Sequence, residues 1–360
     1  MSRPFLALVV LCLACGSSSN PDAAVPLDQA TAVDLAMLDS ELADAAPSDL
    51  SVDDAALPDA ASVDSRAFFV GDGGAFADTV RVVAANLSTG NNQDYNGGEG
   101  IRILRGVHAD VVLLQEFRYL SNSTTDLRAF VDSAVGTEFN YVRGASTEQI
   151  PNGVLSRFPV LSSGEWTDPQ VSNRAFLWAQ LDVPGPRDLW VVSLHLLTSN
   201  AGARDAEAHA LLPLLQQNVP AGDFLIVGGD LNTSVRAEPC IATLSALVVS
   251  NTPWPSDNFG NGNTNGPRTR PHDWLLASAN LIPLEVPVVI GASGYTSGLV
   301  VDTRVYSPIA EIAPALTGDS GANGMQHMAV LRDFVIAANG STTDMASVVD
   351  LASADLQFHD

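Results

Sequence analysis

Short runs of apolar residues recur along the chain after residue 79, and their lengths of four to eight residues are typical of buried β-strands. Between them, residues 99–107 and 203–217 have apolar residues at helical spacing, and Pro213 is expected to kink or shorten the second stretch. Strands that alternate with helices indicate a layered α/β domain. The runs that predict strands are residues 80–84, 111–114, 176–181, 189–194, 224–227, 274–277 and 329–336.

Polar residues stand at the ends of six of these runs. Those that follow a run are Asn86, Glu116, His195 and Asp230, and those that precede a run are Asp273 and His327. Antiparallel placement of the last two strands in a mixed sheet would bring all six positions to one edge. That edge is where the site of an α/β domain is expected.

Each of these residues has an ordinary interpretation when it is taken alone. Glu116 is typical of a solvated loop or a helix cap, and Asp230 is typical of a turn. A single histidine such as His195 or His327 is more often a hydrogen-bonded core residue than a ligand. The combined set is harder to explain in this way, because it places carboxylate, amide and imidazole groups at one edge.

This combination of side chains favours metal-assisted hydrolysis of a phosphoester. Carboxylates and amides without a cysteine–histidine cluster suit a hard divalent cation, so Mg²⁺ or Mn²⁺ is the expected cofactor. Such an ion neutralises charge on the phosphoryl oxygens while a histidine base activates water. The sequence contains no Gly-x-Gly-x-x-Gly motif, no Walker loop and no serine-hydrolase elbow, which argues against a nucleotide cofactor and against a nucleophilic serine.

The order of these motifs resembles the endonuclease/exonuclease/phosphatase superfamily, which has the deoxyribonuclease I-like fold. The resemblance covers most of the chain after residue 79, and its most specific parts are Gln115-Glu116 and Gly229-Asp230-Leu231-Asn232. It implies an α/β four-layer sandwich with two central mixed β-sheets flanked by helices. The other matching segments are Val83-Ala84-Ala85-Asn86, Asn152-Gly153-Val154-Leu155-Ser156-Arg157-Phe158-Pro159, Ser193-Leu194-His195-Leu196, His272-Asp273-Trp274-Leu275-Leu276 and His327-Met328-Ala329-Val330.

The resemblance also implies a role for each candidate residue. Glu116 corresponds to the principal metal ligand, and Asn86 supports the metal and the phosphate. The Asp230 and Asn232 positions orient the attacking water and the phosphate. His327 corresponds to the catalytic histidine, and Asp273 to the aspartate that supports it. His195 corresponds to a second histidine near the phosphate or leaving group, and Arg174 loosely matches a phosphate-binding arginine.

Gln326 departs from the family pattern, which usually has aspartate immediately before the final histidine. A glutamine side chain brings no negative charge, so the resemblance leaves open a second metal and tight binding of the first. Asp319 is close in sequence and is a candidate replacement. An impaired site is compatible with an alternative function, a non-catalytic surface-binding protein that retains the fold.

Charge and cysteine content limit which binding partners and which disulfide bonds are expected. The chain has 17 basic residues, all of them arginine, and 41 acidic residues, for a net charge of −24. Because nucleic-acid binding normally uses a basic face, this acidity lowers the case for nucleic acid without excluding it. Cys12 and Cys15 lie near the N-terminus, so the domain has no disulfide framework, and Cys240 is interpreted as a small buried hydrophobe.

The N-terminal segment predicts export. An apolar run at residues 5–14 is too short for a membrane span, which needs about 20 residues, and is typical of a signal peptide. Leu13-Ala14-Cys15-Gly16 resembles a bacterial lipoprotein signal with lipidation at Cys15, although an ordinary cleaved signal is the alternative. The predicted parts are this signal (1–15), an acidic Ala/Asp-rich disordered tether (16–78), the catalytic domain (79–338) and a C-terminal tail (339–360).

Taken together, the sequence predicts an exported, monomeric, Mg²⁺- or Mn²⁺-dependent phosphodiester hydrolase. Its location would be the bacterial cell envelope through an N-terminal lipid anchor in the membrane, or the medium if the signal is simply cleaved. Nucleic acid, a phospholipid head group and a small phosphoester remain alternative substrates, so nuclease and sphingomyelinase-type activities are both open. The loops at 251–270 and 291–325 are candidates for setting specificity.

Overall fold

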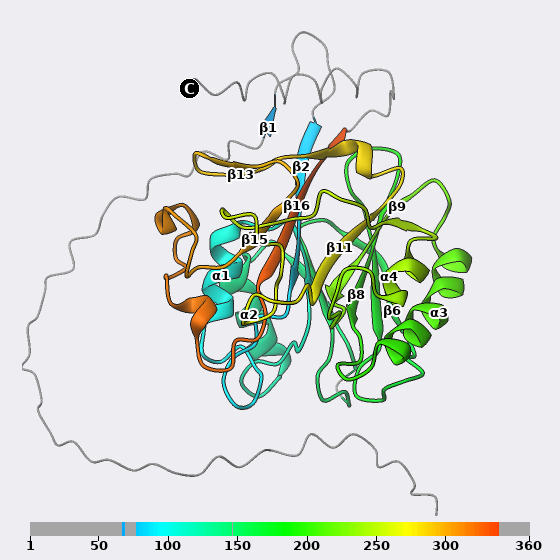
Figure 1. Cartoon of the computed structure of the whole chain (residues 1–360), viewed down its shortest axis with the longest axis horizontal. Helices are drawn as coiled ribbons and strands as arrows, with labels where there is room; N and C mark the ends of the chain where they lie inside the picture. Colours follow the sequence, from blue (N-terminus) through cyan, green and yellow to red (C-terminus); the bar gives the residue numbers. More distant parts are fainter. Residues whose placement is uncertain (1–66, 69–76, 146, 338–360) are drawn as a thin grey trace, which may run out of the picture. The chain divides into compact units, whose positions relative to one another are not determined.

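Two β-sheets form the centre of the computed structural model, which describes residues 67–68, 77–145 and 147–337 (Figure 1). The predicted signal with Cys15, the C-terminal tail and nearly all of the predicted tether lie outside the described residues. The described residues belong to one compact unit, Ser62–Asp360. No helix among them has the length and hydrophobicity that a membrane span requires.

The first sheet has eight strands and the second has six. Strands of the first sheet are β1 (Ala67–Phe68), β2 (Ala77–Ala85), β3 (Val111–Leu114), β4 (Asn140–Arg143), β5 (Gly153–Ser156), β12 (Glu285–Val286), β15 (Leu299–Val301) and β16 (Ala329–Ala337). Strands of the second are β6 (Val160–Trp166), β7 (Phe176–Leu181), β8 (Leu189–His195), β9 (Phe224–Asp230), β10 (Val248–Val249) and β11 (Asp273–Ser278). A separate hairpin joins β13 (Val288–Ile290) to β14 (Ser293–Tyr295).

Strand direction explains how residues at opposite ends of their strands meet. The first sheet has the order β12-β16-β2-β3-β5-β4, with β1 beside β2 and β15 beside β16, and the second has the order β10-β11-β9-β8-β7-β6. β2 is parallel to β3 and β8 to β9, whereas β16 is antiparallel to β2 and β11 to β9. The expected antiparallel placement is therefore confirmed. The expectation of one sheet edge is wrong, because the six positions are divided between two sheets.

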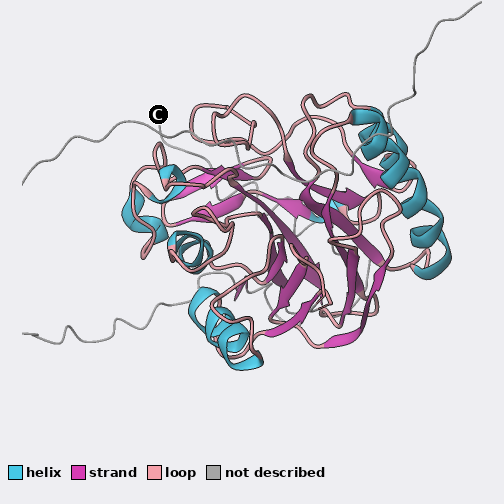
Figure 2. Cartoon of the chain, turned by 90° about the horizontal axis from the view of Figure 1, so that it is seen from below, coloured by secondary structure: helices cyan, strands magenta, loops and turns pink. Residues whose placement is uncertain are grey.

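Three hydrophobic cores separate four layers, which confirms the predicted α/β sandwich. Alternation along β2 sends Val83 to the outer core under the helices and Val82 to the core between the sheets. The third core lies between the second sheet and its helices and contains Cys240, which is fully buried as predicted. Figures 1 and 2 show the helices on opposite sides of the paired sheets.

The helices differ from the prediction in number and length. The predicted helix at 99–107 is α1 (Glu99–Val107), and the one at 203–217 is α3 (Ala201–Asn218), which begins after the Asn200 side chain caps the Gly202 amide. Pro213 does not shorten α3, because Leu211 and Leu215 on either side of it are buried against the sheet. The other helices are α2 (Thr124–Ala134), α4 (Pro239–Leu244), and the 3₁₀ helices η1 (Ile282–Leu284), η2 (Ile309–Ile312) and η3 (Asp319–Gly321).

Candidate active site

Asp230, at the end of β9, is the centre of a buried polar cluster. Its Oδ2 atom lies 3.1 Å from Nδ2 of Asn86, 3.4 Å from Nε2 of His195 and 3.3 Å from Nε2 of His327. Its other oxygen accepts the backbone N–H of Asn232 at 2.9 Å. These residues come from both sheets, so the two sheets together form the site. Asn86, His195, Asp230 and His327 were all predicted to meet here, and the structure brings them together.

Glu116 and Asn86 form the part of the site that suits a cation. The Ser88 hydroxyl donates to one oxygen of Glu116, and Nδ2 of Asn86 lies 3.5 Å from the other. Burial raises the pKa of Glu116 above its ordinary value, against the lowering effect of Ser88 and His327. Oδ1 of Asn86 is buried and has no hydrogen-bond partner among the residues that the structure describes. A carboxylate beside an unpartnered amide oxygen is a donor set that fits Mg²⁺ or Mn²⁺.

Backbone conformation is unusual at two of the candidate positions. Glu116 and Asn232 both have a φ of 52°, in the left-handed region that non-glycine residues rarely adopt. Each residue turns the chain two positions after a strand ends, Glu116 after β3 and Asn232 after β9. Such outliers cluster at functional sites because surrounding contacts hold them in place.

His327 is held between two carboxylates. Its Nδ1 lies 3.0 Å from Oδ2 of Asp273, and its Nε2 faces Asp230. The Asp273 amide in turn donates to the Thr264 hydroxyl at 2.7 Å. Burial opposes the charged imidazole, but Asp230 and Asp273 outweigh it and raise the pKa of His327 to about 10. The predicted pairing of His327 with Asp273 is present in the structure.

His195 differs from His327 because its segment is anchored through the backbone. Arg174 donates through Nε to the carbonyl of His195 and through Nη2 to that of Leu196, the latter at 3.1 Å. The side chain of Asn232 also donates to the Leu196 carbonyl, at 3.0 Å. Burial lowers the pKa of His195 well below its ordinary value. Arg174 and Asn232 thus position the end of β8, and their predicted contacts with phosphate or water stay predictions.

His272 belongs to the site, although the sequence reasoning gave it no role. Its ring centroid lies 5.4 Å from that of His327, and candidate ligand atoms of Asp230, His272 and His327 lie within 4.8 Å of one another. Burial lowers its pKa to about 4. The only signal in the sequence was its position directly before Asp273, and alternation along a strand would send neighbouring side chains to opposite faces.

The structure shows where Gln326 and its candidate replacement Asp319 lie. Its side chain is exposed, and its backbone carbonyl accepts the Gly266 amide at 2.6 Å. Asp319 does not replace the missing carboxylate, because it is buried in an ion pair with Arg102 at 2.6 Å. The acidic groups that raise the pKa of His327 are Asp230, Asp273 and Glu116, and the candidate replacement Asp319 is not one of them.

The chain is similar to a known protein family and to several solved structures. Residues 101–309 match the profile of the Endonuclease/Exonuclease/phosphatase family, more than half of the chain. The sequence has no match among the curated proteins. Similar solved structures include an endonuclease/exonuclease/phosphatase from Bacteroides vulgatus (17% identity, 72% of this chain and 99% of that chain, TM-score 0.48) and one from Beutenbergia cavernae (18%, 72% and 72%, TM-score 0.49).

A functionally unknown conserved protein from Enterococcus faecalis is similar over 72% of this chain and all of its own, with 13% identity and a TM-score of 0.50. At this identity the likeness concerns the fold alone. The family match, by contrast, spans the segments that carry Glu116, His195, Asp230 and Asp273. The chain therefore belongs to the endonuclease/exonuclease/phosphatase family.

Proposed function

We propose that the protein is a metal-dependent phosphoester hydrolase and, more narrowly, a phosphodiesterase. The observation that carries the proposal is the convergence of Glu116, the unpartnered Oδ1 of Asn86, and the Asp230–His327–Asp273 chain in one buried cluster. Glu116 and Asn86 would hold Mg²⁺ or Mn²⁺. When bound, that ion neutralises charge on the phosphoryl oxygens and on the leaving group.

The protein's own residues divide the remaining work. Asp230 is the carboxylate placed to accept the proton of the attacking water, because Asn86, His195 and His327 all fix its orientation. His327 is held by Asp273 through Nδ1, and its Nε2, which faces Asp230, is the atom that would donate to the phosphate or to the leaving oxygen. His195 approaches the same oxygen of Asp230 and would offer a second contact with the phosphate. His272 is the third histidine of the site and lies beside His327.

We propose further that the protein is exported and that its substrate belongs to one of three classes of phosphoester. The apolar run at residues 5–14 and Cys15 support an exported, lipid-anchored protein, with a secreted form as the alternative. Extracellular nucleic acid, phospholipid and small phosphoesters are the candidate substrates, and the protein would act as a monomer. The absence of a carboxylate at Gln326 favours one competing function, a surface-binding protein without turnover.

Hydrolysis of bis-p-nitrophenyl phosphate tests the proposal directly. Purified protein should release p-nitrophenol with Mg²⁺ or Mn²⁺. This release should stop when EDTA removes the ion. Parallel assays on plasmid DNA, sphingomyelin and inositol phosphates would separate the candidate substrates. If metal-loaded protein hydrolyses none of them, the binding-protein alternative is the better description.

Glu116→Gln tests the proposed metal ligand. The substitution keeps the shape of the side chain but removes its charge, so activity should fall at least about a hundredfold and calorimetric Mn²⁺ binding should weaken. The control is Glu138→Gln, because Glu138 is exposed and lies between α2 and β4, away from the cluster. Near-normal turnover of Glu116→Gln at low metal concentration would exclude Glu116 as the principal ligand.

A further inference from the structure

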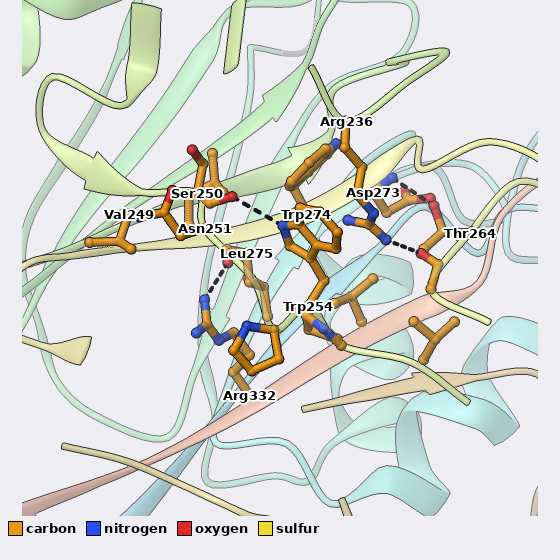
Figure 3. Close-up of a pocket in the computed structure, with 16 residues that line it drawn as sticks. Arg236, Val249, Ser250, Asn251, Trp254, Thr264, Asp273, Trp274, Leu275 and Arg332 are labelled. Atoms are coloured by element: carbon orange, nitrogen blue, oxygen red, sulfur yellow. Dashed lines mark hydrogen bonds between the residues drawn. The ribbon is translucent and has the colours of Figure 1, made fainter. Parts of the chain in front are cut away.

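Arg236 is a half-buried cation that the proposed chemistry does not use. It lies in the loop that continues from Asp230 and Asn232, and its Cζ atom lies 4.5 Å from the ring centroid of Trp254 and 5.0 Å from that of Trp274. Figure 3 shows the side chain beside Trp274, in a pocket that also includes Asp273. The loop from β9 and the first residues of β11 thus connect this arginine to the reaction centre.

Arg236 has no carboxylate partner among the described residues, unlike Arg204 and Arg268. Arg204 pairs with Glu238 at 2.8 Å, and Arg268 pairs with Asp302 at 2.6 Å. For Arg236 the described residues provide one hydrogen-bond acceptor, the Gly262 carbonyl at 2.6 Å, and no ion pair. Burial lowers its pKa to about 10. A partly desolvated cation without a counter-charge is unfavourable, and an anionic ligand would offset that cost.

The surroundings determine which ligand can reach the guanidinium. A guanidinium has five N–H donors in one plane, and here two indoles lie against it. The indoles and the Gly262 carbonyl take up part of this cation's surroundings, so a ligand meets the N–H donors that remain. Guanidinium N–H donors form charge-assisted hydrogen bonds with phosphate oxygens. The pocket that Arg236 lines with Trp254 and Trp274 has a volume of ≈ 20 Å³, room for about one water-sized group such as a single phosphate oxygen.

We propose that Arg236 binds a second phosphate group of the substrate, next to the phosphate that is hydrolysed. This inference rests on the proposed phosphoester hydrolase function and narrows its substrate class. A nucleotide chain or a small ester with two phosphates meets the requirement. A lipid head group with a single phosphate does not use this contact.

Two chromogenic substrates that differ by one phosphate provide the test. They are thymidine 5′-(p-nitrophenyl phosphate) and the same compound with an added 3′-phosphate. In the wild-type protein the added phosphate should lower KM. Arg236→Met should reduce that advantage about tenfold, the effect of losing one charge-assisted contact, and Arg236→Lys should retain part of it. A third substrate, with the 3′-phosphate esterified to a second nucleoside, separates a nucleotide chain from a small bisphosphate.

Arg187→Met is the matched control. Arg187 also stacks on a ring, with its Cζ 5.5 Å from the Phe224 centroid, but it precedes β8 and so lies at the strand end opposite His195. Its removal should leave the preference for the second phosphate unchanged. Thermal melting of each variant confirms that it is folded. Equal KM changes for both substrates in Arg236→Met, or no wild-type preference for the added phosphate, would overturn the proposal.

A binding measurement distinguishes failure of the Arg236 site from failure of the hydrolase proposal. In EDTA, calorimetry compares thymidine 3′,5′-bisphosphate with thymidine 5′-phosphate, and no turnover is needed. The wild-type protein should bind the bisphosphate more tightly, and Arg236→Met should lose most of that difference. If neither chromogenic substrate is hydrolysed but this binding difference holds, the hydrolase proposal fails and the Arg236 site stands. The reverse result removes the Arg236 site alone.

Discussion

At the scale of single residues, the environment of His327 makes stability depend on pH. Its pKa is raised to about 10 by Asp230 and Asp273 against the effect of burial, whereas an unfolded histidine has a pKa of about 6.5. The folded protein therefore holds this proton more tightly than the unfolded chain. The resulting stabilisation is fully present below about pH 6.5 and is lost as the pH rises through about 10.

Asp273→Asn tests this dependence. Removing the carboxylate that contacts Nδ1 should lower the pKa of His327, so the metal-free variant should lose less stability between pH 7 and pH 10 than the wild-type protein. Urea unfolding in EDTA at several pH values measures the difference. His209→Gln is the control, because His209 is an exposed residue of α3. Parallel pH profiles for wild type and Asp273→Asn would show that Asp273 does not hold the proton.

At the scale of elements, an ionic cluster fixes the loop that leads into β11. The Asp302 carboxylate is buried and accepts hydrogen bonds from Arg268 at 2.6 Å and from Arg304 at 2.7 Å. Arg268 belongs to the same loop as Thr264, whose hydroxyl accepts the Asp273 amide and whose carbonyl accepts the Met328 amide. This part of the predicted specificity loop is therefore a support for the His327–Asp273 pair.

Asp302→Asn should weaken this support. A buried pair that loses one charge leaves the other uncompensated, so the free energy of unfolding should fall by about 3 kcal/mol, and turnover should fall as Asp273 becomes less well fixed. Asp132→Asn removes an exposed helical pair with Arg128 and should cost only about 0.5 kcal/mol. Burial raises the pKa of Asp302, but its arginines outweigh burial and lower it, so the deficit should shrink as the pH falls through that lowered pKa. Equal losses in the two variants would contradict the cluster's role.

The elements show what could be predicted from sequence and what could not. Apolar runs located β3 and β7 at their observed bounds, because buried strands need a continuous apolar segment. The short strands β10, β12 and β15 were missed, since two or three residues carry no period. The place of His272 could not be inferred either. It depends on how β11 begins at the junction between two sheets, which no local pattern encodes.

At the scale of the whole molecule, residues far apart in sequence form one site because the two sheets face each other. Asn86 directly follows β2 and His327 shortly precedes β16, both strands of the first sheet, and Asp230 and Asp273 lie in the second. The core between the sheets contains Val82, Leu113, Ile226 and other apolar residues of both, so packing of that core brings the two halves of the site together. The full sequence that carries this site is strongly acidic, with a net charge of −24.

That net charge leads to an expectation about salt. A nuclease that neutralises six to ten phosphates loses about 10³–10⁵ in affinity between 50 and 200 mM salt, because counterions are released on binding. Here Arg236 supplies one local contact while the net negative charge of the chain repels a polyanion, and salt screens that repulsion. We therefore expect KM for a short single-stranded oligonucleotide to change less than about tenfold over this range. The measurement is KM against NaCl concentration at fixed Mg²⁺, with bis-p-nitrophenyl phosphate as the reference for effects on chemistry. A hundredfold or greater weakening would require a basic binding face, and the role of Arg236 as a single local contact would then be too small to explain substrate binding.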